Sequence, residues 1–199
     1  MTDSASRYAL LACIFVLFLL SGQSTNAQPE AEIRAAPEQL CDKVLCRTPA
    51  TIRLNMPEGQ LFEMTPLLPT PIVVGNLFTV YAGETVRIEA TVQNQRLTNF
   101  RAVKKVIDPQ RTLIFYFKQE PGIGDGTEMI LQVQSPFAGV LKYRLGMMLP
   151  TGDALFQTSA CPLHGGITAY EHWRHPIFQI VAADFRFVDP DSDAATTCE

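Results

Sequence analysis

Four residues that could hold a metal ion lie close together late in the chain. His164 stands three positions after Cys161, and His175 stands three positions after His172. Thiolate and imidazole groups are ligands that zinc and copper accept readily, and the protein contains no other histidine. A small zinc or copper protein that uses His164, His172 and His175 is therefore one hypothesis for the function.

Disulfide formation competes with that use of Cys161. If an N-terminal segment that carries Cys13 is removed, four cysteines remain, and an even number in an exported chain predicts two disulfides. Four cysteines allow three pairings, and the sequence does not choose among them. We favour the pairing of near neighbours, which joins Cys41 to Cys46 and Cys161 to Cys198. A disulfide sulfur is a poor metal ligand, so we expect no cofactor.

The same segment carries side chains of the kind that anchor partners at interfaces. Tyr170, Trp173 and Arg174 combine aromatic rings with a guanidinium group, which is the composition of interface hot spots. The competing interpretation is that the ring of Trp173 folds back and covers the core. We expect a loop from Cys161 to Pro176 and place these three candidate binding residues on it.

A second candidate binding group is basic. Five Lys and Arg residues occur within residues 96–111, and Arg101 and Lys105 have the parity that would place them on one face of a strand. Such a patch could bind an acidic partner. Charged residues also protect sheet edges from pairing with other chains, which is the simpler interpretation of the same residues.

The sequence contains no arrangement typical of a nucleophilic enzyme. There is no Gly-x-Ser-x-Gly motif, and once Cys161 is bridged no free thiol stands beside a histidine. Catalysis is left open at this point, but we favour a protein that is not an enzyme and assign no catalytic residues.

The N-terminal residues predict export. The apolar run Tyr8 to Leu20 is too short to span a bilayer comfortably, which takes about 20 residues, but it suits the apolar core of a secretory signal peptide. We expect residues 1–27 to be a cleaved signal peptide and residues 28–49 to be a linker with a small disulfide loop. The mature protein is then secreted or periplasmic and is not an integral membrane protein.

Residues 50–190 show the alternation of β-strands. In Glu84–Gln93 apolar residues occupy every second position, which predicts a half-buried strand. Thr112–Phe117 is almost wholly apolar, which predicts a strand buried on both faces. About eight or nine such segments predict an all-β, immunoglobulin-like β-sandwich, with a jelly roll or a closed barrel as the alternative. Residues 191–199 are expected to be an acidic tail that carries a cysteine.

The composition narrows the class of partner. The 199 residues carry a net charge of −4 and are 47% hydrophobic, which predicts a globular domain rather than a disordered chain. No nucleic-acid partner is expected, because that would need a concentrated basic surface. We therefore expect a secreted or periplasmic, non-enzymatic binding module whose partner is an unknown protein or a cell-envelope glycan.

Overall fold

The computed structural model describes residues 40–122 and 127–199. The expected signal peptide and most of the expected linker lie outside this range. The strands among the described residues are β1 (Cys46–Arg47), β2 (Ile52–Asn55), β3 (Leu61–Met64), β4 (Thr70–Pro71), β5 (Val73–Val74), β6 (Leu77–Tyr81), β7 (Thr85–Gln93), β8 (Arg96–Ala102), β9 (Thr112–Pro121), β10 (Thr127–Gln134), β11 (Val140–Met148), β12 (Leu155–Thr158), β13 (Leu163–His164), β14 (Thr168–Trp173) and β15 (Gln179–Val188). Two short 3-10 segments, η1 (Pro57–Gly59) and η2 (Asp193–Ala195), occur as well.

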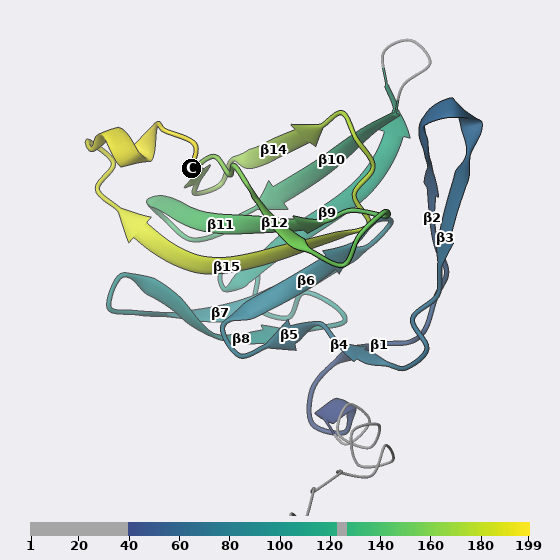
Figure 1. Ribbon diagram of the computed structural model, residues 1–199. Helices are drawn as coiled ribbons and strands as arrows, with labels where there is room; N and C mark the ends of the chain where they lie inside the picture. Colours follow the sequence, from purple (N-terminus) through teal and green to yellow (C-terminus); the bar gives the residue numbers. More distant parts are fainter. Residues whose placement is uncertain (1–39, 123–126) are drawn as a thin grey trace, which may run out of the picture. The chain divides into compact units, whose positions relative to one another are not determined.

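Eleven of these strands form one large antiparallel sheet, which confirms the prediction of an all-β protein (Figure 1). The first arm of the sheet runs β14-β10-β9-β7-β8. The second arm contains β12, β11 and β15, with β13 beside β11, and with β6 and then β5 on the other side of β15. Among the described residues a single pair, Arg186 with Arg96, joins the two arms. The outermost strands β12 and β14 do not pair there, so the closed barrel considered above is wrong.

The residue pattern of β9 decides which face of the first arm is buried. Leu113, Phe115 and Phe117 are completely buried on its inner face, whereas Ile114 and Tyr116 are only half-buried on its outer face. The prediction that this strand is buried on both faces is therefore wrong. The second arm covers only the inner face of β9, so Ile114 and Tyr116 on the outer face remain partly in contact with solvent.

The hydrophobic core lies between the two arms. The ring of Phe115 on β9 stands 4.9 Å from that of Phe78 on β6 and 6.2 Å from that of Phe185 on β15, measured between centroids. Tyr143 on β11 stacks on Phe185 at 5.2 Å. Burial of each such side chain contributes about 1.5–3 kcal/mol. Packing of these aromatic rings, far more than the single backbone pair, therefore holds the arms together.

The segment Cys161–Pro176, predicted as a loop, contains the edge strand β14. This strand pairs with β10 in six consecutive residue pairs. Its side chains alternate, with Tyr170 and His172 facing outward and Glu171 facing inward. A polar residue at an inward position hides the strand pattern, which explains why the sequence predicts a loop here.

Both disulfides have the pairing that we favoured from the sequence, Cys41–Cys46 and Cys161–Cys198. Disulfides form and persist in oxidising compartments, so they indicate an extracytoplasmic environment. Within residues 40–122 and 127–199 there is no helix with the length and apolar character needed to cross a membrane.

The two disulfides should differ in their contribution to stability. The paired change Cys161→Ala and Cys198→Ala is expected to lower the free energy of unfolding by roughly 4 kcal/mol, because this bridge joins residues 37 positions apart. The matched control, Cys41→Ala with Cys46→Ala, removes a bridge across 5 positions and should cost about 2 kcal/mol. Urea unfolding of both variants measures the difference. Equal losses would show that the C-terminal bridge adds nothing beyond a local ring.

Candidate binding surface

Two tyrosines and a glutamine form a row on the outer face of the first arm. Gln132 on β10 lies directly opposite both Tyr116 on β9 and Tyr170 on β14. Neighbouring strands are about 4.8 Å apart, so roughly 10 Å separates the two tyrosines along the row. Tyr170 is 56% exposed, and Tyr116 and Gln132 are half-buried. The row therefore presents two aromatic rings with an amide group between them.

A second row lies beside the first. Ile130 on β10 is opposite Lys118 on β9 and His172 on β14. The amine of Lys118 is 5.4 Å from the centroid of the Tyr116 ring, which is a cation–π contact. Nδ1 of His172 is 3.1 Å from Oε1 of Glu128. These contacts restrict the polar side chains that border the tyrosine row.

A cavity of about 380 Å³ opens at one end of the same face. It is lined by residues of the next cross-strand row and of the segments on either side: Ile114, Gln134 and Thr168, then Val106 and Pro109 before β9, and Gly166 and Ile167 before β14. Ligand pockets usually measure about 300–1,000 Å³, so a small chemical group fits here. The tyrosine row and this cavity are together termed the outer-face site.

The basic residues predicted to bind are placed differently from one another. Arg101 on β8 forms an ion pair with the buried Glu89 on β7. Lys105 is exposed between β8 and β9, next to Val106 in the cavity wall. The expectation that Arg101 and Lys105 share one strand face is wrong, because β8 ends at Ala102. Lys105 instead borders the outer-face site from a loop.

Trp173 and Arg174 lie away from the tyrosine row. The ring of Trp173 is on the inner face of β14, is 8% exposed, and stands 6.2 Å from Phe117. Its Nε1 donates a hydrogen bond of 2.8 Å to Oγ1 of Thr158. Arg174 is exposed beyond the end of β14. Of these binding candidates on the segment, Tyr170 is the one that the structure places in the outer-face site.

The three histidines occupy separate elements. His164 belongs to β13, His172 to β14, and His175 follows β14, while the sulfur of Cys161 is bonded to Cys198. In the described part of the chain, no three His, Cys, Asp or Glu side chains are grouped so that they could hold a metal ion. The geometry does not bring the three histidines together as one ligand set.

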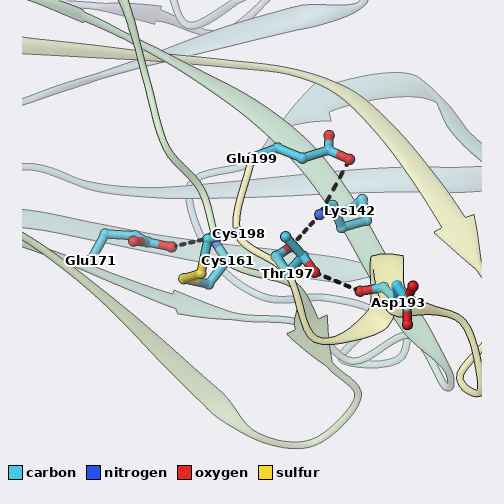
Figure 2. Close-up of a disulfide and its surroundings, with 7 residues drawn as sticks. All are labelled: Lys142, Cys161, Glu171, Asp193, Thr197, Cys198 and Glu199. Carbon is cyan, nitrogen blue, oxygen red and sulfur yellow. Dashed lines mark hydrogen bonds and ion pairs between the residues drawn. A yellow bond between two sulfur atoms is a disulfide. The ribbon is translucent and has the colours of Figure 1, made fainter.

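The strand β14 is tethered on its inner face by the region of the second disulfide (Figure 2). Oε1 of Glu171 accepts a hydrogen bond of 2.6 Å from the backbone N–H of Cys161, whose sulfur is bonded to Cys198. Glu171 alternates with Tyr170 and His172 along the strand. Because neighbouring side chains of a strand point to opposite faces, this tether restrains the backbone that presents Tyr170 outward.

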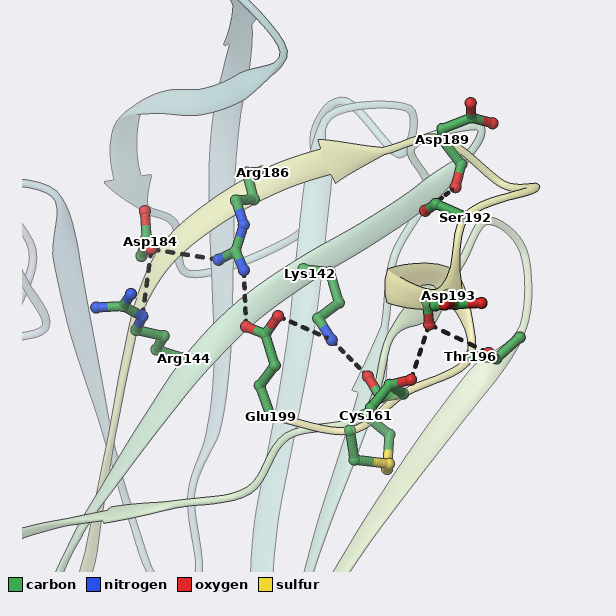
Figure 3. Close-up of polar contacts among 12 residues, drawn as sticks. Lys142, Arg144, Cys161, Asp184, Arg186, Asp189, Ser192, Asp193, Thr196 and Glu199 are labelled. Carbon is green, nitrogen blue, oxygen red and sulfur yellow. Dashed lines mark hydrogen bonds and ion pairs between the residues drawn. A yellow bond between two sulfur atoms is a disulfide. The ribbon is translucent and has the colours of Figure 1, made fainter.

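The residues next to Cys198 close over the side chain of Lys142 (Figure 3). Lys142 on β11 is completely buried, and its amine donates a hydrogen bond to the carbonyl oxygen of Thr197 and lies 3.3 Å from Oε1 of Glu199. Arg186 donates a hydrogen bond of 2.7 Å to Oε2 of Glu199, and this bond, with smaller contributions from Lys142, lowers the pKa of Glu199. Residues 197–199 with Lys142 and Arg186 are termed the C-terminal clasp.

An ionic network extends the clasp along β15 (Figure 3). The carboxylate of Asp184 lies 3.3 Å from Arg186 and 3.4 Å from Arg144, as Figure 3 shows. It also lies 2.5 Å from Arg96. Asp184 has a φ of 56° and sits where the register between β11 and β15 shifts, which identifies a β-bulge. The bulge keeps Phe185 in the core while Asp184 faces the arginines. Because Arg96 belongs to β8, this network also links the two arms.

Burial changes the acidity of two groups behind β14. The pKa of Glu171 is raised above its ordinary value of 4.5, mainly because burial disfavours the carboxylate; the N–H of Cys161 and the nearby His172 lower it in part. The pKa of Tyr143 is raised well above 10.0 by burial and, to a smaller extent, by the charge of Glu171. Tyr143 therefore stays neutral at physiological pH.

A smaller cavity of about 200 Å³ lies near β1 and β4. It is lined by Arg47, whose Nε donates a hydrogen bond of 2.7 Å to Glu84 and whose Nη1 donates one of 3.0 Å to Thr79. The guanidinium group also lies 4.5 Å from the centroid of the Tyr81 ring. These contacts fasten β1 to the main sheet, so Arg47 has a structural role that explains its burial.

Sequence reasoning missed Tyr116 and Gln132. Tyr116 lies in the apolar run that predicts a fully buried strand. Gln132 is a polar residue with nothing in its local sequence that indicates a binding role. The one indication in the sequence is spacing: Ile114 and Tyr116 are two positions apart, so they lie on the same face of β9. Recognising that face as a surface also requires the register with β10 and β14, which joins segments far apart in the chain.

Comparison of the chain with protein-family models, curated proteins and solved structures finds no match. The assignment of a function therefore depends on the geometry of the outer-face site.

Replacing Trp173 with Ala separates a core role from a binding role. The change should lower the free energy of unfolding by about 3–5 kcal/mol, because it removes a buried ring and the hydrogen bond to Thr158. Trp173→Phe keeps an aromatic ring beside Phe117 and should cost much less. Denaturant unfolding measures both. An unchanged unfolding midpoint for Trp173→Ala would contradict the inward placement of the ring.

Glu171→Gln tests the buried carboxylate. Because the native pKa is raised above 4.5, the native state binds more protons than the unfolded state above that pH, and the stability contributed by this group falls as pH rises. The stability of Glu171→Gln relative to the wild type should therefore increase between about pH 4.5 and the raised native pKa, by at most about 1.4 kcal/mol per pH unit, and stay constant at higher pH. Thermal unfolding across pH measures this, with the exposed Glu58→Gln as control. A pH-independent difference would contradict the shift.

Proposed function

We propose that the protein is a secreted or periplasmic, non-enzymatic binding module that binds a cell-envelope glycan on the outer-face site. The observation that carries this proposal is the row Tyr116–Gln132–Tyr170, formed by residues directly opposite one another on three neighbouring strands. The two disulfides support function in an oxidising extracytoplasmic compartment, where such glycans occur.

The row has the chemical character that a sugar chain requires. A pyranose ring has an apolar C–H face, which can pack on an aromatic ring, and a rim of hydroxyl groups that donate and accept hydrogen bonds. Tyr116 and Tyr170 supply aromatic surface with little conformational entropy to lose. The amide of Gln132 offers both donors and an acceptor between them. An extended chain lying along the row would contact the two tyrosines with separate sugar rings.

The balance of polar and apolar groups favours a glycan over a protein partner. A stable protein interface buries about 800 Å² on each partner around an apolar core. On this face of the first arm the apolar side chains Ile114 and Ile130 are half-buried and are flanked by Gln132, Gln134 and Lys118. The exposed apolar side chains Val106 and Ile167 lie in the cavity wall. Such a narrow, mixed surface suits the repeating apolar faces and hydroxyl groups of a sugar chain.

The finer description of the fold is also a proposal. The facing rings of Phe115 and Phe185 support two packed layers of the kind found in an immunoglobulin-like sandwich. The strand order β8-β7-β9-β10-β14 differs from the strand order of immunoglobulin sheets, so the proposed likeness concerns the layers only.

Binding of purified peptidoglycan and of soluble cell-envelope polysaccharides tests the function. Tyr170→Ala and Tyr116→Ala should each weaken glycan binding about 10-fold or more, since each removes one stacking surface. Tyr170→Ala should leave stability within about 0.5 kcal/mol of the wild type because the side chain is largely exposed. Co-sedimentation and calorimetry measure binding, and thermal unfolding verifies the fold.

Phe156→Ala is the matched control, because Phe156 is a 46% exposed aromatic residue on the edge strand β12, outside the outer-face site. It should leave glycan binding unchanged. If the wild type binds none of the polysaccharides, or if the tyrosine variants bind as well as the wild type, the proposed function is wrong. Capture of a specific protein that depends on Tyr170 would instead establish a protein-binding module.

A further inference from the structure

The charges across the outer-face site are mostly balanced in pairs. Three ion pairs lie on this face of the first arm: Lys118 with Glu120, Arg101 with Glu89, and His172 with Glu128. Each couples a basic group with a carboxylate on the same or a neighbouring strand. The Lys118–Glu120 and Arg101–Glu89 pairs balance charge for charge, so they give no preference for a charged ligand along the tyrosine row.

The cavity end of the site is different. Arg87, Lys104 and Lys105 form no ion pair with any residue that the structure describes. Arg87 on β7 lies directly opposite Ile114, which lines the cavity, and the two lysines directly precede Val106 in its wall. Positive charge is therefore concentrated beside the cavity.

One acidic residue lies in the same segment. The carboxylate of Asp108 accepts a hydrogen bond of 3.0 Å from the backbone N–H of Gln110, which holds it in a local turn. Its single negative charge is smaller than the three positive charges of Arg87, Lys104 and Lys105, so the net charge beside the cavity is positive. The chain as a whole carries a net charge of −4, so attraction of an anion must come from nearby groups. Screening over about 8 Å at physiological ionic strength allows this local excess to dominate.

We propose that the ligand is an acidic polysaccharide and that the carboxylate of a uronic-acid unit binds at the mouth of the cavity, between Arg87 and Lys105. This inference rests on the proposed function, in which neighbouring sugar rings pack on Tyr116 and Tyr170. A planar guanidinium group matches a carboxylate through two parallel hydrogen bonds, and Lys105, which directly precedes Val106 in the cavity wall, adds a second charge. The cavity volume of about 380 Å³ accommodates the carboxylate with part of its sugar ring.

The test compares two forms of one polymer, polygalacturonate and the same polymer after reduction of its carboxyl groups to hydroxyls. The wild type should bind the acidic form at least about 10-fold more tightly than the reduced form. The preference should shrink between about 50 mM and about 500 mM NaCl, because salt screens the charges. Calorimetry or affinity electrophoresis measures all four combinations.

The paired change Arg87→Gln and Lys105→Gln should remove the preference while leaving binding of the reduced polymer unchanged. Arg87→Lys should keep part of the preference, since it retains the charge but loses the paired hydrogen bonds. Lys43→Gln is the control for charge alone, because Lys43 is exposed in the segment before β1. Thermal unfolding establishes that each variant is folded.

The outcomes distinguish this inference from the proposed function. Equal binding of both polymer forms overturns the acidic-ligand inference, and so does a paired variant that still prefers the acidic form. If Tyr170→Ala then loses binding of both forms, glycan binding on the outer-face site stands without the acidic preference. If the wild type binds neither form nor any other glycan, the proposed function fails and this inference fails with it. If Lys43→Gln loses the preference for the acidic polymer to the same extent as the paired variant, the preference comes from the net charge of the protein. That result would also overturn the assignment of the carboxylate to the cavity.

Discussion

Burial of the Lys142 ammonium group is the constraint on which this end of the molecule depends. Removing such a group from water costs several kcal/mol unless partners replace its hydration. The partners, the carbonyl of Thr197 and the carboxylate of Glu199, come from the C-terminal residues. Lys142 can therefore occupy β11 only while those residues are folded across it. The Cys161–Cys198 disulfide holds them there, and Ala160 and Glu199 exchange two backbone hydrogen bonds of 2.6 and 3.0 Å.

The clasp and the candidate site are connected through Cys161. Its sulfur holds the C-terminal residues, and its backbone N–H holds Glu171 on β14. An edge strand has one side without a partner strand and is normally the first part of a sheet to open. The tether from Cys161 restrains this edge strand from its inner face. Tyr170 is therefore presented by a restrained strand although its own side chain is mostly exposed, and a restrained strand loses less entropy when a ligand binds.

Alternation of apolar and polar residues predicts those strands whose apolar side chains pack against the other arm of the sheet. Glu84–Gln93 is a strand in the structure almost to the residue, because its inward positions carry apolar side chains. The same rule fails where distant polar groups decide burial. The charge of Lys142 favours an outward position, but residues 197–199 bury its side chain. Glu171 lies in a segment predicted as a loop, but its side chain faces inward and accepts a hydrogen bond from Cys161, 10 positions earlier in the sequence. Neither partner can be identified from local pattern.

The candidate site is harder to predict than the strands because it is a property of register. Tyr116 and Tyr170 are 54 positions apart in the sequence, and only the pairing of β9, β10 and β14 makes them members of one row. Each aromatic ring alone is an unremarkable surface residue. Aligned across three strands beside a cavity, they form the row on which the proposed function rests. In the proposed binding mode, a sugar chain covers the rings with its apolar face and turns its outer hydroxyl groups to the water, so the apolar surface of the rings leaves contact with solvent.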